Sequence, residues 1–179
     1  GRDQTSWFPF ARFIAESGYK VFTFDFRGYG KSTGIKDTRM DRDLEAAIAY
    51  MRAKGAQQVV LIGASMGGTA VIELASESQV QGVAALSPPA EFGRINALTA
   101  VESMVIPLLL IVSENDYQYY SDARKIESAA AATQFLVVEG QQHGTNMIAE
   151  HRNEIFANLL AFLDRWTDDR LLTTVQTES

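Results

Sequence analysis

Three residues of this chain have the types that nucleophilic catalysis uses, and they occur in the order Ser65, Asp116, His143. A serine hydroxyl attacks a carbonyl carbon when a histidine accepts its proton, and a carboxylate holds that histidine in the right tautomer. The chemistry that these residues could perform is acyl transfer. In that hypothesis Ser65 is the nucleophile, His143 the general base and then acid, and Asp116 the orienting carboxylate.

Ser65 lies in the pattern Gly63-Ala64-Ser65-Met66-Gly67, which matches G-x-S-x-G. The pattern alone is weak in a chain with 13 glycines. Its context strengthens it, because a predicted strand over Gln58–Ile62 runs into the serine and a predicted helix over Met66–Glu77 follows at once. Such a turn exposes the hydroxyl and aims the backbone N–H of Met66 at a developing oxyanion, while the glycines leave room between strand and helix. The alternative is an ordinary glycine-rich turn in which Ser65 caps the helix.

His143 stands in the segment Gly140–Thr145, just after a predicted strand over Gln134–Val138. The carboxyl ends of parallel strands are where an α/β sheet carries its functional groups, so this histidine is the candidate base. The alternative is a solvated loop histidine. The other histidine, His151, lies among charged residues at a helix start and is interpreted as a surface residue.

Asp116 follows a predicted strand over Pro107–Val112 and precedes a helix. Its expected role is to hold the imidazole and to stabilise the imidazolium. Glu114 and Asp122 are competing carboxylates nearby, and a loop or helix-capping carboxylate is the plainer alternative for Asp116. We favour Asp116 because the nearest helix is expected to begin just after it.

The elements that must position these residues alternate along the chain. Strands are predicted over Tyr19–Asp25, Gln58–Ile62, Gln81–Leu86, Pro107–Val112 and Gln134–Val138, and helices over Trp7–Ser17, Asp37–Lys54, Met66–Glu77, Arg94–Glu102, Ser121–Ala132 and Ile148–Trp166. This alternation predicts an α/β fold with a mostly parallel sheet and helices on both faces. We expect one domain over residues 1–166 and a polar tail over residues 167–179.

The composition excludes several other chemistries. The chain has no cysteine, which excludes disulfides, thiolate zinc sites and a cysteine nucleophile. It has only two histidines, so we expect no metal, and nothing in the sequence calls for a cofactor. The net charge of −6 offers no basic surface for nucleic acid or for an anionic membrane, and the longest apolar run, Val105–Val112, has the length of a strand. The expected partner is therefore a small-molecule substrate, with no nucleic acid and no membrane.

The segment Asp25–Ser32 contains glycines and a lysine but lacks the G-x-x-x-x-G-K-[ST] spacing of a phosphate-binding loop. We interpret it as a tight turn in which Asp25 and Arg27 hold the loop through hydrogen bonds.

Together these residues resemble the α/β-hydrolase superfamily. The resemblance is carried by Gly18–Val21, Asp25–Ser32, the turn at Ser65, Asp116 and Gly140–Thr145, and it covers nearly all of residues 3–166. It is closest to small cap-less members of the dienelactone-hydrolase-like and esterase kind, because about twenty residues between Leu86 and Pro107 are too few for a cap domain. The resemblance implies the α/β-hydrolase fold and a Ser-His-Asp triad. Dienelactone hydrolases proper use a cysteine nucleophile, so their substrate is not carried over.

The beginning of the chain departs from this pattern. In the superfamily a central strand and a His-Gly-type turn precede the segment that starts at Asp3, and that turn supplies another oxyanion N–H. With five predicted strands where the family usually has eight, we interpret the chain as N-terminally truncated. Three explanations stay open: the sequence is incomplete, the strands Tyr19–Asp25 and Gln58–Ile62 pair directly, or another chain supplies a strand, for example in a homo-oligomer joined through sheet edges. No signal peptide is recognised, so a cytoplasmic location is expected.

The sequence thus predicts a serine hydrolase that cleaves small carboxylic esters through an acyl-enzyme. A thioesterase or a peptidase on the same triad is an alternative, because one fold hosts many chemistries. A further alternative is a catalytically weak, truncated hydrolase fold that acts as a binding or assembly module. A fluorophosphonate probe separates the serine enzymes from the non-catalytic module, because only an activated serine is labelled.

Overall fold

The structure, a computed structural model, describes residues 3–36, 39–77 and 79–167. Within these residues four parallel strands form one sheet in the order β1 (Val60–Ala64), β2 (Gly82–Leu86), β5 (Leu108–Ser113), β6 (Thr133–Val138). A short antiparallel hairpin of β3 (Glu91–Phe92) and β4 (Ile95–Asn96) lies apart from this sheet. Of the tail predicted over residues 167–179, all but the first residue lies outside the described part of the chain.

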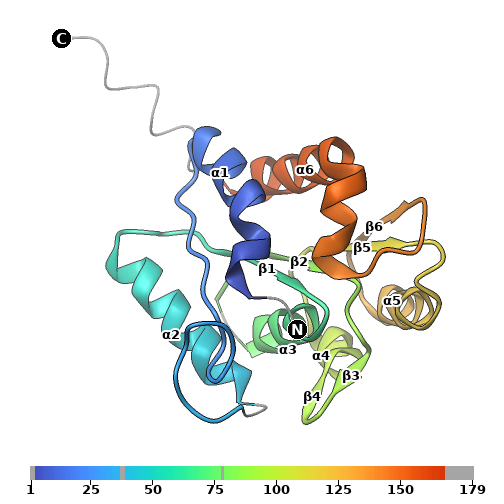
Figure 1. The fold of residues 1–179 in the computed structure, drawn as a ribbon. Coiled ribbons are helices and arrows are strands. Elements are labelled where there is room, and N and C mark those ends of the chain that lie inside the picture. Colours follow the sequence, from blue (N-terminus) through green and yellow to red (C-terminus); the bar gives the residue numbers. More distant parts are fainter. Residues whose placement is uncertain (1–2, 37–38, 78, 168–179) are drawn as a thin grey trace.

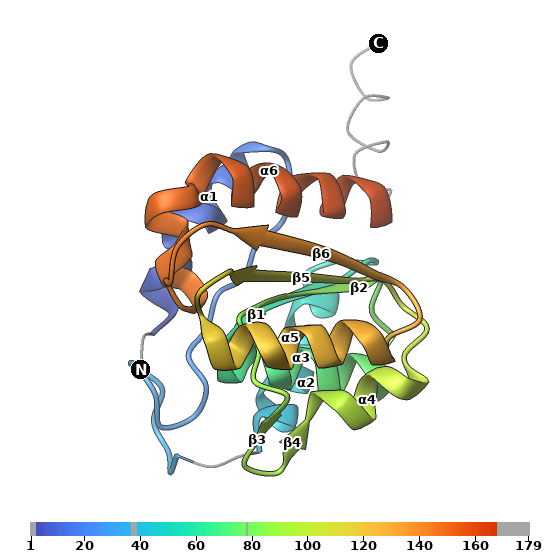
Figure 2. The ribbon, with the colours of Figure 1, turned by 90° about the vertical axis from the view of Figure 1, so that its right-hand side faces the viewer.

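Helices cover both faces of the sheet. They are η1 (Gln4–Trp7), α1 (Phe8–Glu16), α2 (Met40–Ala53), α3 (Met66–Glu77), α4 (Ala97–Ser103), α5 (Tyr117–Ala129), η2 (Gly144–Asn146) and α6 (Met147–Trp166). Figures 1 and 2 show α1 and α6 on one face and α2, α3, α4 and α5 on the other. The prediction of an α/β fold with a parallel sheet between two helical layers is confirmed.

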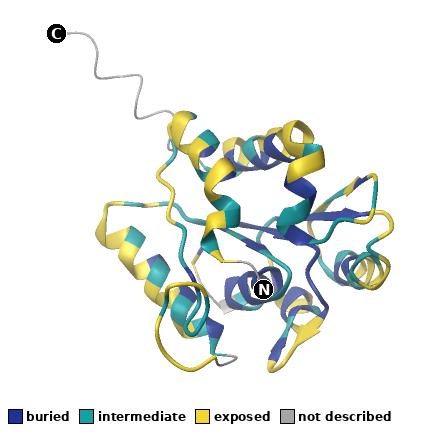
Figure 3. Ribbon diagram, viewed as in Figure 1, coloured by how far each residue is buried: buried dark blue, intermediate teal, exposed yellow. Residues whose placement is uncertain are grey.

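The two central strands divide their side chains between the two layers. Alternate residues of a strand point to opposite faces, so a doubly covered strand is apolar at every position. In β2, Val83 and Ala85 pack in the core beneath α2 to α5, whereas Ala84 and Leu86 pack in the core beneath α1 and α6. All five residues of β2 are buried, which appears as dark blue at the centre of Figure 3.

Most predicted elements lie close to their observed bounds. The helix over Met66–Glu77 is observed with the same bounds, while α5 begins at Tyr117 rather than at Ser121. The short chain between β2 and β5 contains only the hairpin and the seven-residue α4. This agrees with the expectation that it is too short for a cap domain.

The predicted strand over Tyr19–Asp25 is wrong, and the expected count of five strands becomes four in the sheet that the structure describes. A strand needs a neighbour that pairs with its backbone, and in the described residues β1 pairs only with β2. Nor does β1 pair directly with this segment, as one explanation had it. The segment is held by its side chains instead: Phe22 stacks on Phe24 and packs against Tyr50 of α2, with centroid distances of 5.9 and 4.9 Å. The aromatic residues that suggested a strand therefore pack against one another and against α2, and the segment joins no sheet.

Candidate active site

Ser65 occupies the sharp turn between β1 and α3. Its backbone has φ +53°, a conformation that costs free energy for any residue other than glycine, and its N–H donates to the carbonyl of Leu86 at 2.8 Å. The next residue, Met66, opens α3, so the helix itself offers its N–H no acceptor. A strained serine therefore adjoins the first residue of a helix, as the G-x-S-x-G pattern predicts. The N–H groups of Gly68 and Thr69 in the same turn donate to the carbonyl of Ser65 at 2.8 and 3.2 Å.

Only one of the two motif glycines is required by close packing. A Cβ at Gly63 would lie 2.2 Å from the carbonyl oxygen of Gly67, a distance that real Cβ atoms do not show. A Cβ at Gly67 would meet Phe26 at 3.6 Å, which is ordinary contact. The expectation that both glycines leave room between strand and helix is right for Gly63 and wrong for Gly67.

His143 bridges Ser65 and Asp116. Its Nδ1 lies 2.8 Å from Oδ2 of Asp116, and its Nε2 lies 2.8 Å from Oγ of Ser65. A carboxylate only accepts hydrogen bonds, so the proton belongs on Nδ1 and the free Nε2 accepts from the serine hydroxyl. The side chain of Asp116 is 10% exposed and that of His143 is 32% exposed, so the pair lies at the border between core and solvent.

Asp116 is also the N-cap residue of α5, yet its side chain makes no capping hydrogen bond. Aspartate at this position normally accepts from a helix N–H, and here the carboxylate contacts the imidazole instead. The competing carboxylates are engaged elsewhere: Glu114 accepts from Asn115, and Asp122 accepts from Lys125 and from the backbone N–H of Ala90.

Two buried serines at the ends of neighbouring strands hold the loop that carries His143. Ser113 donates from Oγ to the carbonyl of Gln142 at 2.7 Å, and Ser87 accepts from the N–H of Gly144 at 3.1 Å. Both serines are fully buried, so these bonds form away from water. The sequence analysis missed both, although their positions directly after or at the end of apolar strands were a usable signal.

The sequence analysis also missed Tyr119, whose ring lies against the imidazole of His143 with a centroid distance of 4.0 Å. The second histidine, His151, lies in α6 and has Nδ1 3.9 Å from the carboxylate of Glu154.

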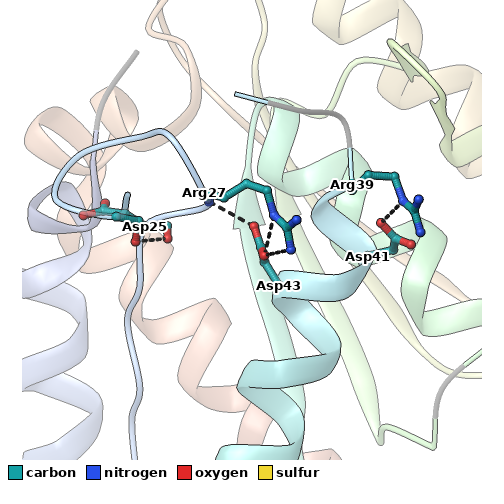
Figure 4. A network of polar contacts seen from close by, with 6 residues as sticks. Asp25, Arg27, Arg39, Asp41 and Asp43 are labelled. Atoms are coloured by element: carbon teal, nitrogen blue, oxygen red, sulfur yellow. Dashed lines mark hydrogen bonds and ion pairs between the residues drawn. The ribbon is translucent and has the colours of Figure 1, made fainter. Parts of the chain in front are cut away.

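A second polar cluster fixes the loop after Asp25. Asp25 accepts from the backbone N–H groups of Gln4 and Lys31 at 2.6 and 3.0 Å, whereas Arg27 bonds to Asp43 on α2 through its backbone N–H and its guanidinium at 2.6 to 2.9 Å. Figure 4 shows Arg27 facing Asp43. Partial burial raises the pKa of Asp43, but the hydrogen bonds and charge of Arg27 outweigh burial and hold that pKa below its ordinary value.

Within the residues that the structure describes, no group of three or more acidic or histidine side chains is placed to hold a metal ion. No helix in the described ranges is both long and apolar enough to span a membrane.

The model of a known family, described as alpha/beta hydrolase fold, matches residues 4–125. This chain belongs to the alpha/beta hydrolase fold family. The matched residues include Ser65 and Asp116 and end before His143. The fold expected from the resemblance is therefore shown.

Curated relatives and solved structures are similar to this alpha/beta hydrolase. The uncharacterized protein YfhR of Escherichia coli K12 is 30% identical over 90 residues, which are 48% of this chain and 31% of that protein. The YfhR protein of Salmonella typhi is 32% identical over 76 residues, 40% of this chain and 26% of its own length. The match thus spans less than a third of either relative.

Three solved structures share the fold at low identity. A monoacylglycerol lipase of Paleococcus ferrophilus has a TM-score of 0.78 and 16% identity, with 93% of this chain and 91% of that chain covered. An esterase of Pyrococcus furiosus has a TM-score of 0.75 and 22% identity, covering 90% and 75%. The esterase domain of a Rhodothermus marinus protein also has a TM-score of 0.75 and 22% identity, covering 93% and 82%.

Proposed function

We propose that this chain is a serine hydrolase that cleaves small carboxylic esters through an acyl-enzyme. The observation that carries the proposal is the unbroken line of contacts from Ser65 through His143 to Asp116, with both heavy-atom distances at 2.8 Å. These distances lie in the range in which a base removes the proton of a nucleophile. Solved structures of the same fold include esterases and a lipase, which supports the choice of reaction.

In the first half of the reaction, Oγ of Ser65 bonds to the ester carbonyl carbon while its proton passes to Nε2 of His143. The carbonyl oxygen becomes an oxyanion, which the N–H of Met66 stabilises at the start of α3. The C–O bond to the alcohol then breaks, and Nε2 gives its proton to the departing oxygen. Asp116 remains ionised throughout and stabilises the imidazolium.

In the second half, a water molecule replaces the alcohol. Nε2 of His143 takes a proton from the water, whose oxygen bonds to the acyl carbon. The bond between that carbon and Oγ of Ser65 breaks, and the proton returns to the serine. The products are the free acid and the resting enzyme.

The substrate size follows from the connection between β2 and β5. This connection holds only the two short strands β3 and β4 and the seven-residue α4, so it has no room for a cap domain. An open site favours short acyl chains or acyl groups exposed on a larger molecule.

The test is hydrolysis of p-nitrophenyl butyrate by the full chain, by Ser65→Ala and by Ser128→Ala. We expect Ser65→Ala to lower kcat by about 10⁴-fold or more, because removing a triad nucleophile removes nearly all chemical catalysis. Ser128 is the matched control, since its hydroxyl donates to the carbonyl of Arg124 on the outer part of α5. Ser128→Ala should match the wild-type rate.

Equal rates for Ser65→Ala and the wild type would contradict the proposal. Labelling by a fluorophosphonate probe supplies a second measure that needs no substrate choice, because it reports an activated serine directly. A thioester cleaved much faster than its oxygen ester would favour the thioesterase alternative on the same triad.

A further inference from the structure

Ser65, Asp116 and Tyr119 are neighbours of the His143 imidazole, and the first two are its hydrogen-bond partners. Asp116 and Ser65 bond to its two nitrogens, Nδ1 and Nε2. The third neighbour, Tyr119, lies against the ring, with centroids 4.0 Å apart and planes inclined at 43°. At this distance the two rings are in van der Waals contact, so a tilt of the imidazole toward α5 is blocked.

The helix explains why Asp116 and Tyr119 reach the same histidine. Residues three positions apart lie on one side of a helix, and Asp116 is the N-cap of α5 while Tyr119 stands in its first turn. The start of α5 therefore presents a carboxylate and an aromatic ring to His143 together.

We propose that Tyr119 is a positioning residue, which keeps the His143 imidazole in line with Ser65 and Asp116 while the acyl-enzyme exists. The inference rests on the proposed function. Once Oγ of Ser65 is bonded to the acyl carbon, the serine has no proton to donate, and the contact that fixed Nε2 is lost. The bond from Nδ1 to Asp116 remains, but a single bond leaves the ring free to rock about it.

The contact between Tyr119 and His143 matters most in the second half-reaction. Nε2 must then meet a water molecule beside the acyl carbon, and a misplaced base lowers the rate even when all groups are present. Tyr119 should therefore affect deacylation more than substrate binding.

The two tyrosines that flank Tyr119 in α5 have other surroundings. Tyr117 is 78% exposed, and Tyr120 packs edge-on against Phe135 of β6 with a centroid distance of 6.2 Å. Tyr117 is thus a matched control on the same turn of α5. Replacing it removes an equal ring without touching the histidine.

The experiment compares Tyr119→Leu, Tyr119→Phe and Tyr117→Leu in the full chain, with Ser65→Ala alongside. Burst kinetics with p-nitrophenyl butyrate separate acylation, seen as the burst, from deacylation, seen as the steady rate. We expect Tyr119→Leu to slow deacylation by about 3- to 10-fold with little change in the burst rate. Tyr119→Phe keeps the ring and should restore the rate, and Tyr117→Leu should match the wild type.

Proton NMR gives a readout of the contact that does not depend on activity. The chain has two histidines, so His151→Gln assigns the His143 carbon-bound protons by elimination. The ring current of Tyr119 displaces these resonances, and the displacement should disappear in Tyr119→Leu and persist in Tyr119→Phe.

Unchanged deacylation in Tyr119→Leu, with Ser65 still required, would overturn the role of Tyr119 and leave the proposed function standing. Equal losses in Tyr119→Phe and Tyr119→Leu would also overturn it, since the hydroxyl rather than the ring would then matter. Loss of the dependence on Ser65 would overturn the proposed function itself, and the Ser65→Ala comparison measures that separately.

Discussion

Gly63 and Gly67 are two residues of one motif with different physical roles. The backbone of Gly67 lies where a side chain at position 63 would stand, so β1 and α3 approach each other at the distance that only glycine allows. Gly67 itself lies in the first turn of α3 with room beside it. A motif glycine is therefore best interpreted by what its missing Cβ would touch.

We predict that Gly63→Ala lowers the free energy of unfolding by about 1–3 kcal/mol, because the new methyl group forces the backbones of β1 and α3 apart. Gly67→Ala should leave this free energy unchanged or raise it by up to about 1 kcal/mol, since alanine favours helix and meets no obstruction. Urea unfolding of both variants beside the wild type measures the difference. Equal losses in the two variants would show that close approach at Gly63 is not the cause.

At the scale of elements, the sequence predicted a segment correctly where the structure of that segment depends mainly on its own residues. The helix Met66–Glu77 and the serine before it follow from a local pattern of glycines and small residues, and both lie where they were expected. Tyr19–Asp25 failed because a strand requires a partner, which its own alternation does not supply. Tyr119 was missed for a similar reason, because its contact with His143 joins residues 24 positions apart in different elements. Ser113 and Ser87 likewise depend on the packing of separate loops.

Figure 4 shows two ion pairs at the start of α2, and they differ in how far their side chains are exposed. Asp43 receives three hydrogen bonds from Arg27, and its side chain is 15% exposed. Oδ1 of Asp41 lies 3.5 Å from Nε of Arg39, and both side chains are about two-fifths exposed. Burial and multiple hydrogen bonds should make the first pair matter more to stability than the second.

We predict that Asp43→Asn lowers the free energy of unfolding at pH 7 by about 1.5–3 kcal/mol, the usual value of hydrogen bonds to a charged group. The pKa of Asp43 is lowered in the folded chain from an ordinary value of 3.8. Its contribution is therefore fully present above that value and is lost as the pH falls below 3.8 through the lowered pKa. The difference between wild type and variant should shrink accordingly in urea unfolding at pH 7, 5, 4 and 3.

Asp41→Asn is the matched control on the same turn of α2. It should cost no more than about 1 kcal/mol at pH 7, because exposed ion pairs contribute little. A difference between wild type and Asp43→Asn that stays constant down to pH 3 would contradict the lowered pKa of Asp43.

At the scale of the whole molecule, the sheet joins two apolar cores into one unit. Leu109 and Ile111 of β5 pack toward α1 and α6, and Leu108 and Leu110 of the same strand pack toward α3 and α4. Neither helical layer can separate from the sheet without exposing one apolar face of these strands to solvent. The site shares this dependence, since Ser65 and Asp116 precede helices of one layer and His143 precedes α6 of the other.

We predict that Ile126→Ala, a change in α5, destabilises both layers together. Ile126 is fully buried, and truncating such a side chain costs about 2–5 kcal/mol. The two tryptophans of the chain, Trp7 and Trp166, both pack against the opposite core. Their fluorescence therefore reports the layer that the substitution does not touch, while far-UV circular dichroism reports the helices of both layers.

The two signals should move to the same lower urea midpoint in Ile126→Ala, because a cooperative domain unfolds in one transition. Leu159→Ala, a change in α6 on the tryptophan side, is the reciprocal control and should give the same coincidence. If circular dichroism falls before fluorescence in Ile126→Ala, the layer of α2 to α5 unfolds separately. His143 would then lose Ser65 and Asp116 while its own layer remained folded, and activity would disappear before the fluorescence transition began.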